Sequence, residues 1–470
     1  MDITLSLNNA LSGLQAAQAN LSVISSNIAN AQTPGYSRET VPLESQIVGG
    51  NGAGVTTGLV QRQIDQNLSE AAREQDTATS FAATTDTYFQ QIQSLYGQVN
   101  SSNSLGTVLG NFSSAMQALA TTPEDPIAQQ NAVSTGQNLA EKLNSMSSGI
   151  QQMRAGVDSD LASSVSTLNT ALQNIANYNS AITHAKASGE STASLEDQRD
   201  QALDQVAQLM GVHDFLRPDG SMVVLTTSGK VLVDNSAVQL TYTQSGTVTA
   251  TTPMSPLGLN SLDLTSEVTS GKIGALLNLR DQQLPNLTAE LNQFTNNLFN
   301  ATSSGNLGTT NSGLGATNDA NHFFAAVDTT NGADNAATIQ VNPDLFTNPG
   351  LLDGPPASPD PTIAQSLADG LNASANFAAA GNFASPTTTT LNNYAAQMVG
   401  QTANAAATAS DNAKFQSSLQ TSFNARASGV SGVSVDQELA NLTIYQNMYA
   451  ASAHVLTVVQ NMLDTLLQIQ

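Results

Sequence analysis

An uncharged helical stripe near the start of the chain constrains its fold more than any other feature. Apolar residues recur there at alternating spacings of four and three: Ile3, Leu7, Ala10, Leu14, Ala17, Leu21, Ile24 and Ile28. This heptad stripe predicts a helix that packs on other helices. No charged residue occurs from Ile3 to Ser37, whereas an ordinary surface helix carries charges on its solvent face. We therefore expect this helix to be surrounded by protein.

A second stripe of the same kind runs from Val435 to Gln470. Its apolar residues again recur every three or four positions: Val435, Leu439, Leu442, Tyr445, Tyr449, Ala453, Leu456, Val459, Leu463 and Leu466. Asp436 and Glu438 stand in the first turns, where negative charge favours a helix N-terminus. The pattern predicts a second long, nearly uncharged helix.

Neither stripe stabilises an isolated helix, because burial of one stripe offsets only part of the conformational entropy lost on ordering. One interpretation is a helix pair docked on a globular domain of the same chain. The other is a pair that assembles with the terminal helices of other subunits, which the missing charges favour. The expected subunit-interface residues are Leu7, Leu14, Leu21, Ile24, Asn27, Ile28, Asn30, Pro34, Gly35, Tyr36, Leu439, Leu442, Tyr445, Tyr449, Leu456, Leu463 and Leu466.

A turn signal ends the first stripe, where residues 33–36 read Thr-Pro-Gly-Tyr. This order predicts a type II turn, because Pro fixes φ at the second position and Gly accepts a positive φ at the third. Asn27 and Asn30 lie on one face near the helix end, where their amides can satisfy terminal carbonyls or bond a neighbouring helix.

The composition excludes several classes of protein. Of 470 residues, 36 are acidic and 13 basic, giving a net charge of -23. Nucleic-acid binding needs a basic patch, and none is visible, so we expect no nucleic-acid partner. The chain has no cysteine, which excludes disulfides and thiolate chemistry. No stretch approaches the ~18 apolar residues of a membrane span, and the N-terminal residues lack the pattern of a cleaved signal peptide.

Motifs for catalysis, cofactors and metals are absent. His184, His213, His322 and His454 lie far apart, without metal-ligand spacing. The Gly-Lys pairs at 229 and 271 lack the Ser or Thr that follows in a phosphate-binding loop. Acidic residues are too scattered to predict a catalytic pair, and no calcium loop is present. We expect no enzyme, no cofactor and no metal site.

The two ends together resemble a known family. Residues 12–38 read SGLQAAQANLSVISSNIANAQTPGYSR and are similar to the N-terminal signature of the flagellar rod, hook and hook-associated proteins. Residues 440–469 read ANLTIYQNMYAASAHVLTVVQNMLDTLLQI and resemble the C-terminal signature. Segments 194–212, 219–233 and 271–285 extend the resemblance to the hook-associated members. In one departure, the acidic pair usual before the C-terminal signature reads Asp436-Gln437-Glu438.

The resemblance implies a structural subunit of the bacterial flagellum that acts as an adaptor between hook and filament. It implies a homo-oligomeric ring in the flagellar axis, with hook protein and the next hook-associated junction protein as neighbours. It also implies an export chaperone at the C-terminal helix, and an extracellular location reached by type III export without a cleaved signal. The alternatives are another axial subunit, such as a hook or distal rod protein, and an exported adhesin or enzyme.

The expected fold class is mainly α with a β-rich insert. We expect an elongated multi-domain protein with paired N- and C-terminal helices, an α-helical body and small β or irregular outer domains. A helix and extended segment over 1–62 would pair with the helix over 431–470. A helical body would be formed by 63–210 with 271–300 and 391–430. The β-rich insert would be 211–270, and an irregular or β outer domain would be 301–390. Alternation and turn pairs over 221–252 predict three or four short strands, and Pro285 is expected to interrupt the helix over 272–300.

A charge cluster is unusual in so neutral a chain. Asp197, Arg199, Asp200 and Asp204 fall on the polar side of the helix expected over 194–212. A solvated helix face with a weak local ion pair is the first interpretation. The other is a structural or subunit contact, because charge is so scarce here.

Overall fold

Long helices dominate the computed structural model, which describes residues 3–48, 51–97, 101–303, 322–325, 334–354 and 360–468. The chain divides into two compact units. Unit 1 comprises Met1–Thr79, Ser166–Leu240 and Gln416–Gln470, and unit 2 comprises Ser80–Val165 and Thr241–Phe415. Helices α2 (Gln66–Tyr96), α4 (Pro126–Ser188) and α11 (Leu391–Ser431) contribute residues to both units. The predicted fold class, mainly α with long terminal helices and small sheets, is confirmed.

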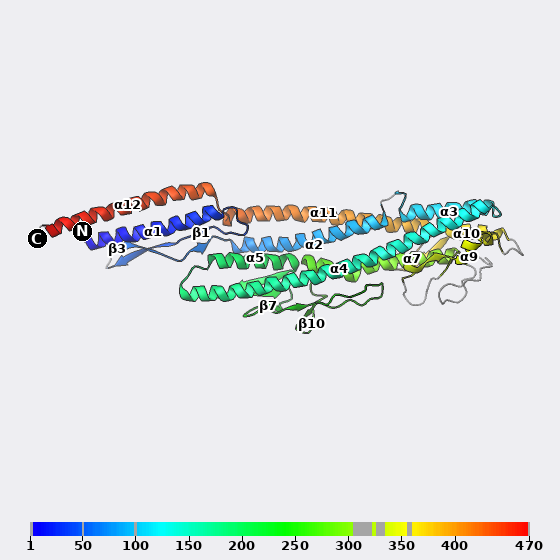
Figure 1. Ribbon diagram of the computed structural model, residues 1–470, viewed down its shortest axis with the longest axis horizontal. Helices are drawn as coiled ribbons and strands as arrows, with labels where there is room; N and C mark the ends of the chain where they lie inside the picture. The colour runs from blue at the N-terminus through cyan, green and yellow to red at the C-terminus, as the bar shows by residue number, and fades with distance from the viewer. Residues whose placement is uncertain are drawn as a thin grey trace. The chain divides into compact units, whose positions relative to one another are not determined.

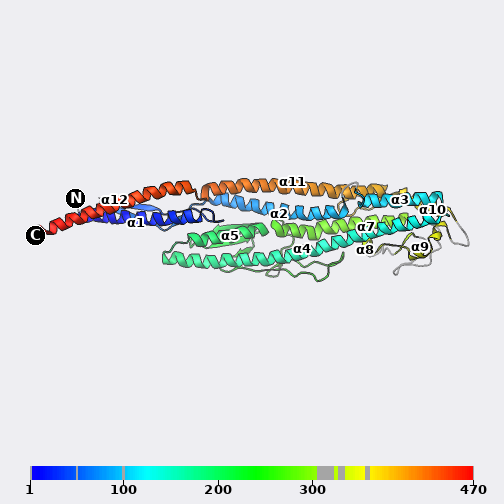
Figure 2. The ribbon, with the colours of Figure 1, turned by 45° about the horizontal axis from the view of Figure 1, so that its top comes forward.

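The terminal helices belong to unit 1. Helix α1 (Ile3–Asn30) and helix α12 (Val435–Gln468) lie side by side in both views of the ribbon (Figure 1, Figure 2). After α1 come strands β1 (Glu39–Thr40), β2 (Leu43–Val48), β3 (Asn51–Thr57) and β4 (Gln61–Arg62). Strand β1 pairs with β4 and β2 with β3, both antiparallel, and β3 contacts α1. The two predicted terminal helices are therefore confirmed.

A small antiparallel sheet completes unit 1 together with helix α5 (Ala193–Leu209). Its strand order is β5 (Val212–Leu216), β6 (Met222–Thr226), β7 (Val231–Val233). Asn179 on α4 anchors this sheet, because its side chain bonds both the N–H and the C=O of Met222, at 2.9 and 2.7 Å. Strand β5 was not predicted, since its sequence VHDFL does not alternate between apolar and polar residues.

Unit 2 contains helix α3 (Leu105–Thr121). Ser104 caps its N-terminus, and the Ser104 side chain accepts a bond from the N–H of Thr107. Helix α6 (Gly271–Asn278) continues through a π-helix (Leu279–Gln283) into α7 (Leu284–Ala301). The α-helix is thus interrupted by the π-helix just before Pro285, while the helical run as a whole continues. Pro285 stands in the first turn of α7, where its missing N–H and fixed φ are tolerated.

Short elements fill the described parts of 301–390. They are β11 (Phe324–Ala325), α8 (Asn335–Thr338), β12 (Gln340–Val341), α9 (Pro343–Thr347), a 3-10 helix (Pro349–Asp353), α10 (Thr362–Asn372), β13 (Ser374–Phe377) and β14 (Thr387–Thr390). Three two-residue strands precede α6: β8 (Leu240–Thr241), β9 (Gly258–Leu259) and β10 (Leu262–Asp263). Helix α10 contacts α3 and buries Ile363, Leu367 and Leu371. The region thus contains a packed helix that its composition did not predict.

Candidate functional site at the terminal helices

Small side chains allow α1 and α12 to approach closely. A Cβ atom added to Gly13 would lie 3.0 Å from Oγ of Ser452. The buried residues of α1 are Ala10, Ala16, Ala17, Asn20, Val23, Ile24 and Asn27, and Val459 is buried on α12. The separation of packed helices depends on the side chains at their contact, so this alanine-rich face suits a close helix pair.

The buried face of α1 is rotated slightly from the predicted stripe. Ile24 is buried, whereas Leu7, Leu14, Leu21 and Ile28 are half-buried. On α12, Leu442, Tyr445 and Leu456 are half-buried, and Leu439, Tyr449 and Leu463 are exposed. The side chain of Leu466 lies outside the described residues. The assignment of these residues to a subunit interface stays a prediction.

A second apolar stripe on α12 faces solvent. It consists of Ile444, Met448, Val455, Val458 and Met462, each between 42% and 55% exposed. We call these five residues the outer stripe. The sequence reasoning missed it because it followed a single stripe, although the spacings of four and seven from Ile444 to Met448, Val455 and Met462 were a readable signal. Helix α12 therefore carries more apolar surface than α1 covers.

The turn after α1 has the predicted form. The N–H of Tyr36 donates to the C=O of Thr33 at 3.2 Å, and Gly35 has φ +75°. Pro34 and Gly35 are exposed, and the C=O of Pro34 accepts a bond from the Gln201 side chain of α5 at 3.2 Å. The positive φ predicted at Gly35 is confirmed, and the turn is tied to α5.

Asn27 fastens the segment after the turn to α1. Its Oδ1 accepts bonds from the hydroxyl of Tyr36 and from the N–H of Glu39, both at 2.9 Å. Its Nδ2 donates to the C=O of Glu39 at 2.9 Å. Burial raises the pKa of the Tyr36 hydroxyl, which remains a donor. Asn30 Nδ2 donates to the C=O of Ser26, one turn earlier in α1, at 3.0 Å.

Ser37 and Arg38 connect this segment to distant parts of unit 1. The N–H of Ser37 donates to Oδ2 of Asp197 on α5 at 3.1 Å. The N–H of Arg38 donates to the C=O of Ser431 at 2.8 Å, and its Nε donates to Oε1 of Glu438 at 2.7 Å. The Glu438 side chain is only 1% exposed. We call Asn27, residues 36–39, Asp197 and Glu438 the terminal junction, because they join α1, α5 and α12.

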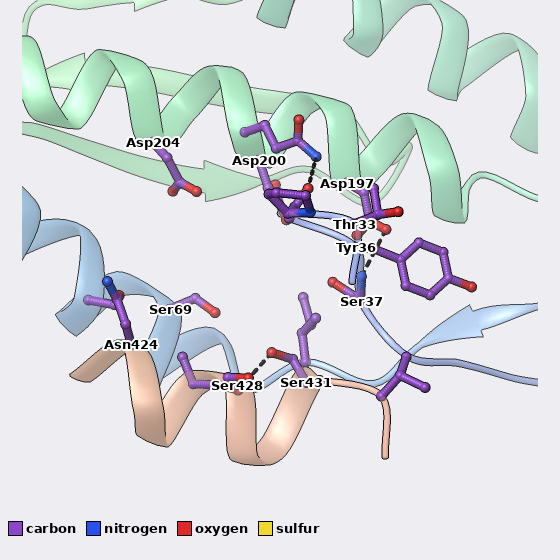
Figure 3. A pocket seen from close by; sticks show the side chains of 18 of the residues that line it. Thr33, Tyr36, Ser37, Ser69, Asp197, Asp200, Asp204, Asn424, Ser428 and Ser431 are labelled. Atoms are coloured by element: carbon purple, nitrogen blue, oxygen red, sulfur yellow. Dashed lines mark hydrogen bonds between the residues drawn. The ribbon is translucent and has the colours of Figure 1, made fainter. Parts of the chain in front are cut away.

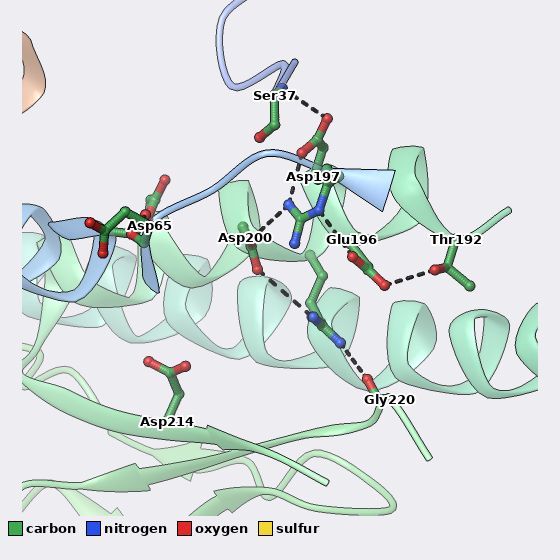
Figure 4. Close-up of polar contacts among 12 residues, drawn as sticks. Ser37, Asp65, Thr192, Glu196, Asp197, Asp200, Asp214 and Gly220 are labelled. Carbon is green, nitrogen blue, oxygen red and sulfur yellow. Dashed lines mark hydrogen bonds and ion pairs between the residues drawn. The ribbon is translucent and has the colours of Figure 1, made fainter. Parts of the chain in front are cut away.

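The charge cluster on α5 supports the junction (Figure 4). Arg62 donates to Glu196 at 3.0 Å, and to Asp197 and Asp200 at 2.8 Å each. Burial would lower the pKa of Arg62, but Asp200 and Asp197 raise it above its usual value. Asp197 and Arg199 are buried, so the predicted solvated face is wrong for these two residues. In a chain with few charges, these charges hold segments of one unit together.

A cavity of about 650 Å³ lies beside the junction (Figure 3). It is lined by the turn, by Asp197, Asp200 and Asp204 on α5, and by the C-terminal end of α11. Asp197 and Asp200 are already held by Arg62. Within the described ranges, no group of three or more His, Asp or Glu side chains is placed to hold a metal ion. Nor does any helix there have the length and apolar character needed to cross a membrane.

Three family models match the chain. The model of the flagellar hook-associated protein FlgK helical domain matches residues 89–324. The flagella basal body rod protein model matches residues 7–36, and the flagellar basal body rod FlgEFG protein C-terminal model matches residues 427–469. The two outer matches cover α1 from Leu7 onward with its turn, and helix α12.

Curated relatives are similar over a shorter stretch. Flagellar hook-associated protein 1 of Salmonella typhimurium is 28% identical over 298 residues, 61% of this chain and 54% of that protein. Flagellar hook-associated protein 1 of Bacillus subtilis is 25% identical over 240 residues, 48% of this chain and 47% of that protein. The chain therefore spans about half the length of the curated relatives it matches. A solved structure of the flagellar hook junction protein FlgK from Burkholderia pseudomallei superposes with a TM-score of 0.46, at 24% identity over 55% of this chain and 47% of that chain.

Proposed function

Because the chain belongs to the flagellar hook-associated protein FlgK family, we propose that it is a structural subunit at the hook–filament junction. In this role it is an adaptor rather than an enzyme, and its terminal helices assemble with those of neighbouring subunits. The subunits form a homo-oligomeric ring in the flagellar axis, outside the cell.

The outer stripe of α12 is the observation that carries this proposal. Helix α1 covers one face of α12, and the outer stripe stays exposed. Burial of apolar area drives association at about 25 cal/mol per Å², and heptad spacing suits further helices. The pair carries few charges, so the repulsion between equivalent helices is small. The terminal junction supports the same role, because it holds the α1–α12 helix pair in a fixed position on α5.

The partners follow from the same proposal. Hook protein and the next hook-associated junction protein are the axial neighbours, and an export chaperone shields α12 before export. Export uses the type III route. A hook or distal rod protein is the alternative axial subunit. The long helices of residues 66–209 favour the junction protein, because a hook protein is expected to be rich in β-structure there.

Deletion and complementation in the bacterium that encodes the chain test this function. Cells without the gene are expected to build hooks without filaments and to lose flagellin to the medium. Complementation with Val458→Asp should fail to restore filaments, because a carboxylate in the outer stripe opposes helix packing. Ile127→Asp is the matched control, since Ile127 is exposed and lies outside the terminal helices. Filaments on cells that carry the deletion, or full complementation by Val458→Asp, would contradict the proposal.

A further inference from the structure

Glu290 in unit 2 is a buried carboxyl group that a tight turn of the chain contacts. It lies on α7 and is 1% exposed. Its Oε1 accepts the N–H of Asn382 at 2.6 Å. Asn382 lies in the connection between β13 and β14, within a turn in which Ala380 and Phe383 exchange two backbone hydrogen bonds of 3.0 Å each. We call residues 380–383 the Glu290 turn.

The Glu290 turn lies directly against α7. Gly381 has φ +57°. A Cβ atom added to it would clash with the C=O of Asn286 and would lie 2.6 Å from Oε1 of Glu290, so the close approach depends on glycine. Asn382 is exposed, whereas Glu290 is not. The carboxyl group therefore lies one residue below the surface, under the turn.

No charged neighbour compensates an ionised Glu290. It is the only charged residue of α7, and residues 87–97 and 374–410 contain none. The titratable groups that face it are the hydroxyls of Tyr96 on α2 and Tyr394 on α11. Both hydroxyls are buried and have no hydrogen-bond partner within the described parts of the chain. Neither of them therefore bonds the carboxylate.

An ionised Glu290 is less stable under the turn than in water. The N–H and the side chain of Asn382 favour the charged form, but burial outweighs them and raises the pKa of Glu290 from 4.5 to about 7. Lys142 on α4 donates to the C=O of Leu95 at 3.0 Å and does not contribute to this shift. Movement of the turn away from α7 would break the bond from Asn382 and would let water reach the carboxylate.

We propose that the Glu290 turn is a pH-sensitive lid, closed over protonated Glu290, whose open fraction rises as Glu290 ionises while the rest of unit 2 stays folded. An open turn returns Glu290 to its ordinary pKa. The open fraction therefore grows between pH 4.5 and about 7 and is level above that range. Opening also moves the ring of Phe383 away from the ring of Tyr394, now 4.8 Å between centroids. The proposal concerns unit 2 alone and does not depend on the role of the terminal helices.

Hydrogen exchange of the full-length protein, followed by mass spectrometry on peptides that cover residues 380–383, tests the proposal. Glu290→Gln keeps the shape of the protonated carboxyl group but does not titrate. Because this substitution lies outside the peptides, the ratio of exchange rates at one pH gives the ratio of open fractions. Wild type and Glu290→Gln should agree within about twofold at pH 4.5, and wild type should exchange about tenfold faster or more at pH 7.5. Glu141→Gln, at an exposed site in the same unit, should match wild type at both pH values.

Urea distinguishes local opening from unfolding of unit 2. A local opening exposes little surface, so about 1 M urea should leave exchange in the turn unchanged and should speed exchange in peptides from α3. Equal acceleration of the turn and α3 by urea would overturn the proposal, because the turn would then open only when unit 2 unfolds. Equal exchange by wild type and Glu290→Gln at pH 7.5 would overturn it as well.

Gly381→Ala gives an independent check. Its Cβ should hold the turn away from α7 at every pH, so exchange in the turn should be fast throughout. Adding Glu290→Gln to this variant should change the rate by less than about twofold, and a tenfold change would contradict the proposed lid. Circular dichroism checks that Gly381→Ala is folded, and the comparison of wild type with Glu290→Gln does not depend on this variant.

Discussion

Arg38 and Glu438 are 400 positions apart in the chain, and Nε of the first lies 2.7 Å from Oε1 of the second. The pair joins the segment after α1 to the first turn of α12. Glu438 is buried, and Arg38 is its ion-pair partner among the residues that the structure describes. The contact thus connects the two ends of the chain.

Loss of Arg38 should destabilise unit 1. Arg38→Met leaves the Glu438 carboxylate buried without a counterion, which costs about 3–5 kcal/mol. Hydrogen exchange followed by mass spectrometry, on peptides that cover residues 27–40 and 431–440, should show faster exchange in the variant. The double variant Arg38→Met/Glu438→Met should recover part of the protection. Protection in Arg38→Met equal to that of Arg426→Met, an exposed-site control, would refute this prediction.

Removal of the Asn27 side-chain amide should lower the free energy of unfolding more than removal of the Tyr36 hydroxyl. Asn27→Ala removes one bond to Tyr36 and two to the backbone of Glu39, for an expected loss of about 2–3 kcal/mol. Tyr36→Phe removes only the hydroxyl, for about 1 kcal/mol. Urea unfolding followed by circular dichroism should rank the variants in this order. The reverse order would mean that the Glu39 backbone does not depend on Asn27.

Substitution of Gly35, in the turn after α1, should destabilise the folded protein. A positive φ of 75° costs a residue with a Cβ about 1–2 kcal/mol. The added Cβ would also meet the Gln201 side chain at 2.4 Å, although that side chain is exposed and can move. Gly35→Ala should lower the denaturation midpoint, whereas Gly246→Ala, with open space around it, should not. Equal midpoints would argue against a strained turn.

The stability of unit 2 should fall as pH rises, because of Glu290. This side chain is 1% exposed, and burial raises its pKa from 4.5 to about 7. It lies near the buried hydroxyls of Tyr96 and Tyr394, and its Oε1 accepts the N–H of Asn382 at 2.6 Å. The folded state therefore keeps a proton that the unfolded chain has already released. The contribution of Glu290 to stability is greatest below pH 4.5 and declines toward pH 7 by about 3 kcal/mol.

Glu290→Gln should remove this decline. The variant should be more stable than wild type at pH 8 and similar at pH 4, as measured by thermal unfolding across the range. Glu141→Gln is the control, because Glu141 is exposed in the same unit. A wild-type profile that is flat between pH 4.5 and 7 would show that folding does not raise the pKa of Glu290.

Local patterns made the terminal helices and the turn predictable. The apolar stripe that predicts α1 lies within one short stretch of sequence. The turn is predicted by the backbone preferences of Pro34 and Gly35 alone. The partners of Ser37 and Arg38 could not be read this way, because nothing near them identifies Asp197 or Glu438. The same limit explains the error at Asp197 and Arg199, since a charge pattern on one helix does not reveal what packs against it.

The outer stripe illustrates a second limit. The pattern of α12 is apolar on more than one face, and periodicity cannot decide which face the chain's own helix covers. Likewise, Nη1 of Arg154 donates to the C=O groups of Thr249 and Ala250. A sequence motif does not encode such contacts with the backbone. Backbone partners of this kind become known only when the fold is known.

The pairing of Arg38 with Glu438 also sets an order in time. A ribosome makes Arg38 long before Glu438, so the early segment waits for its charge partner while 399 intervening residues are added. Contacts this distant form late, because the chain entropy of closing a long loop must be overcome first. Helix α1 thus lacks α12 as a partner during most of synthesis. The contact between Arg38 and Glu438 forms only after the C-terminal helix has been made.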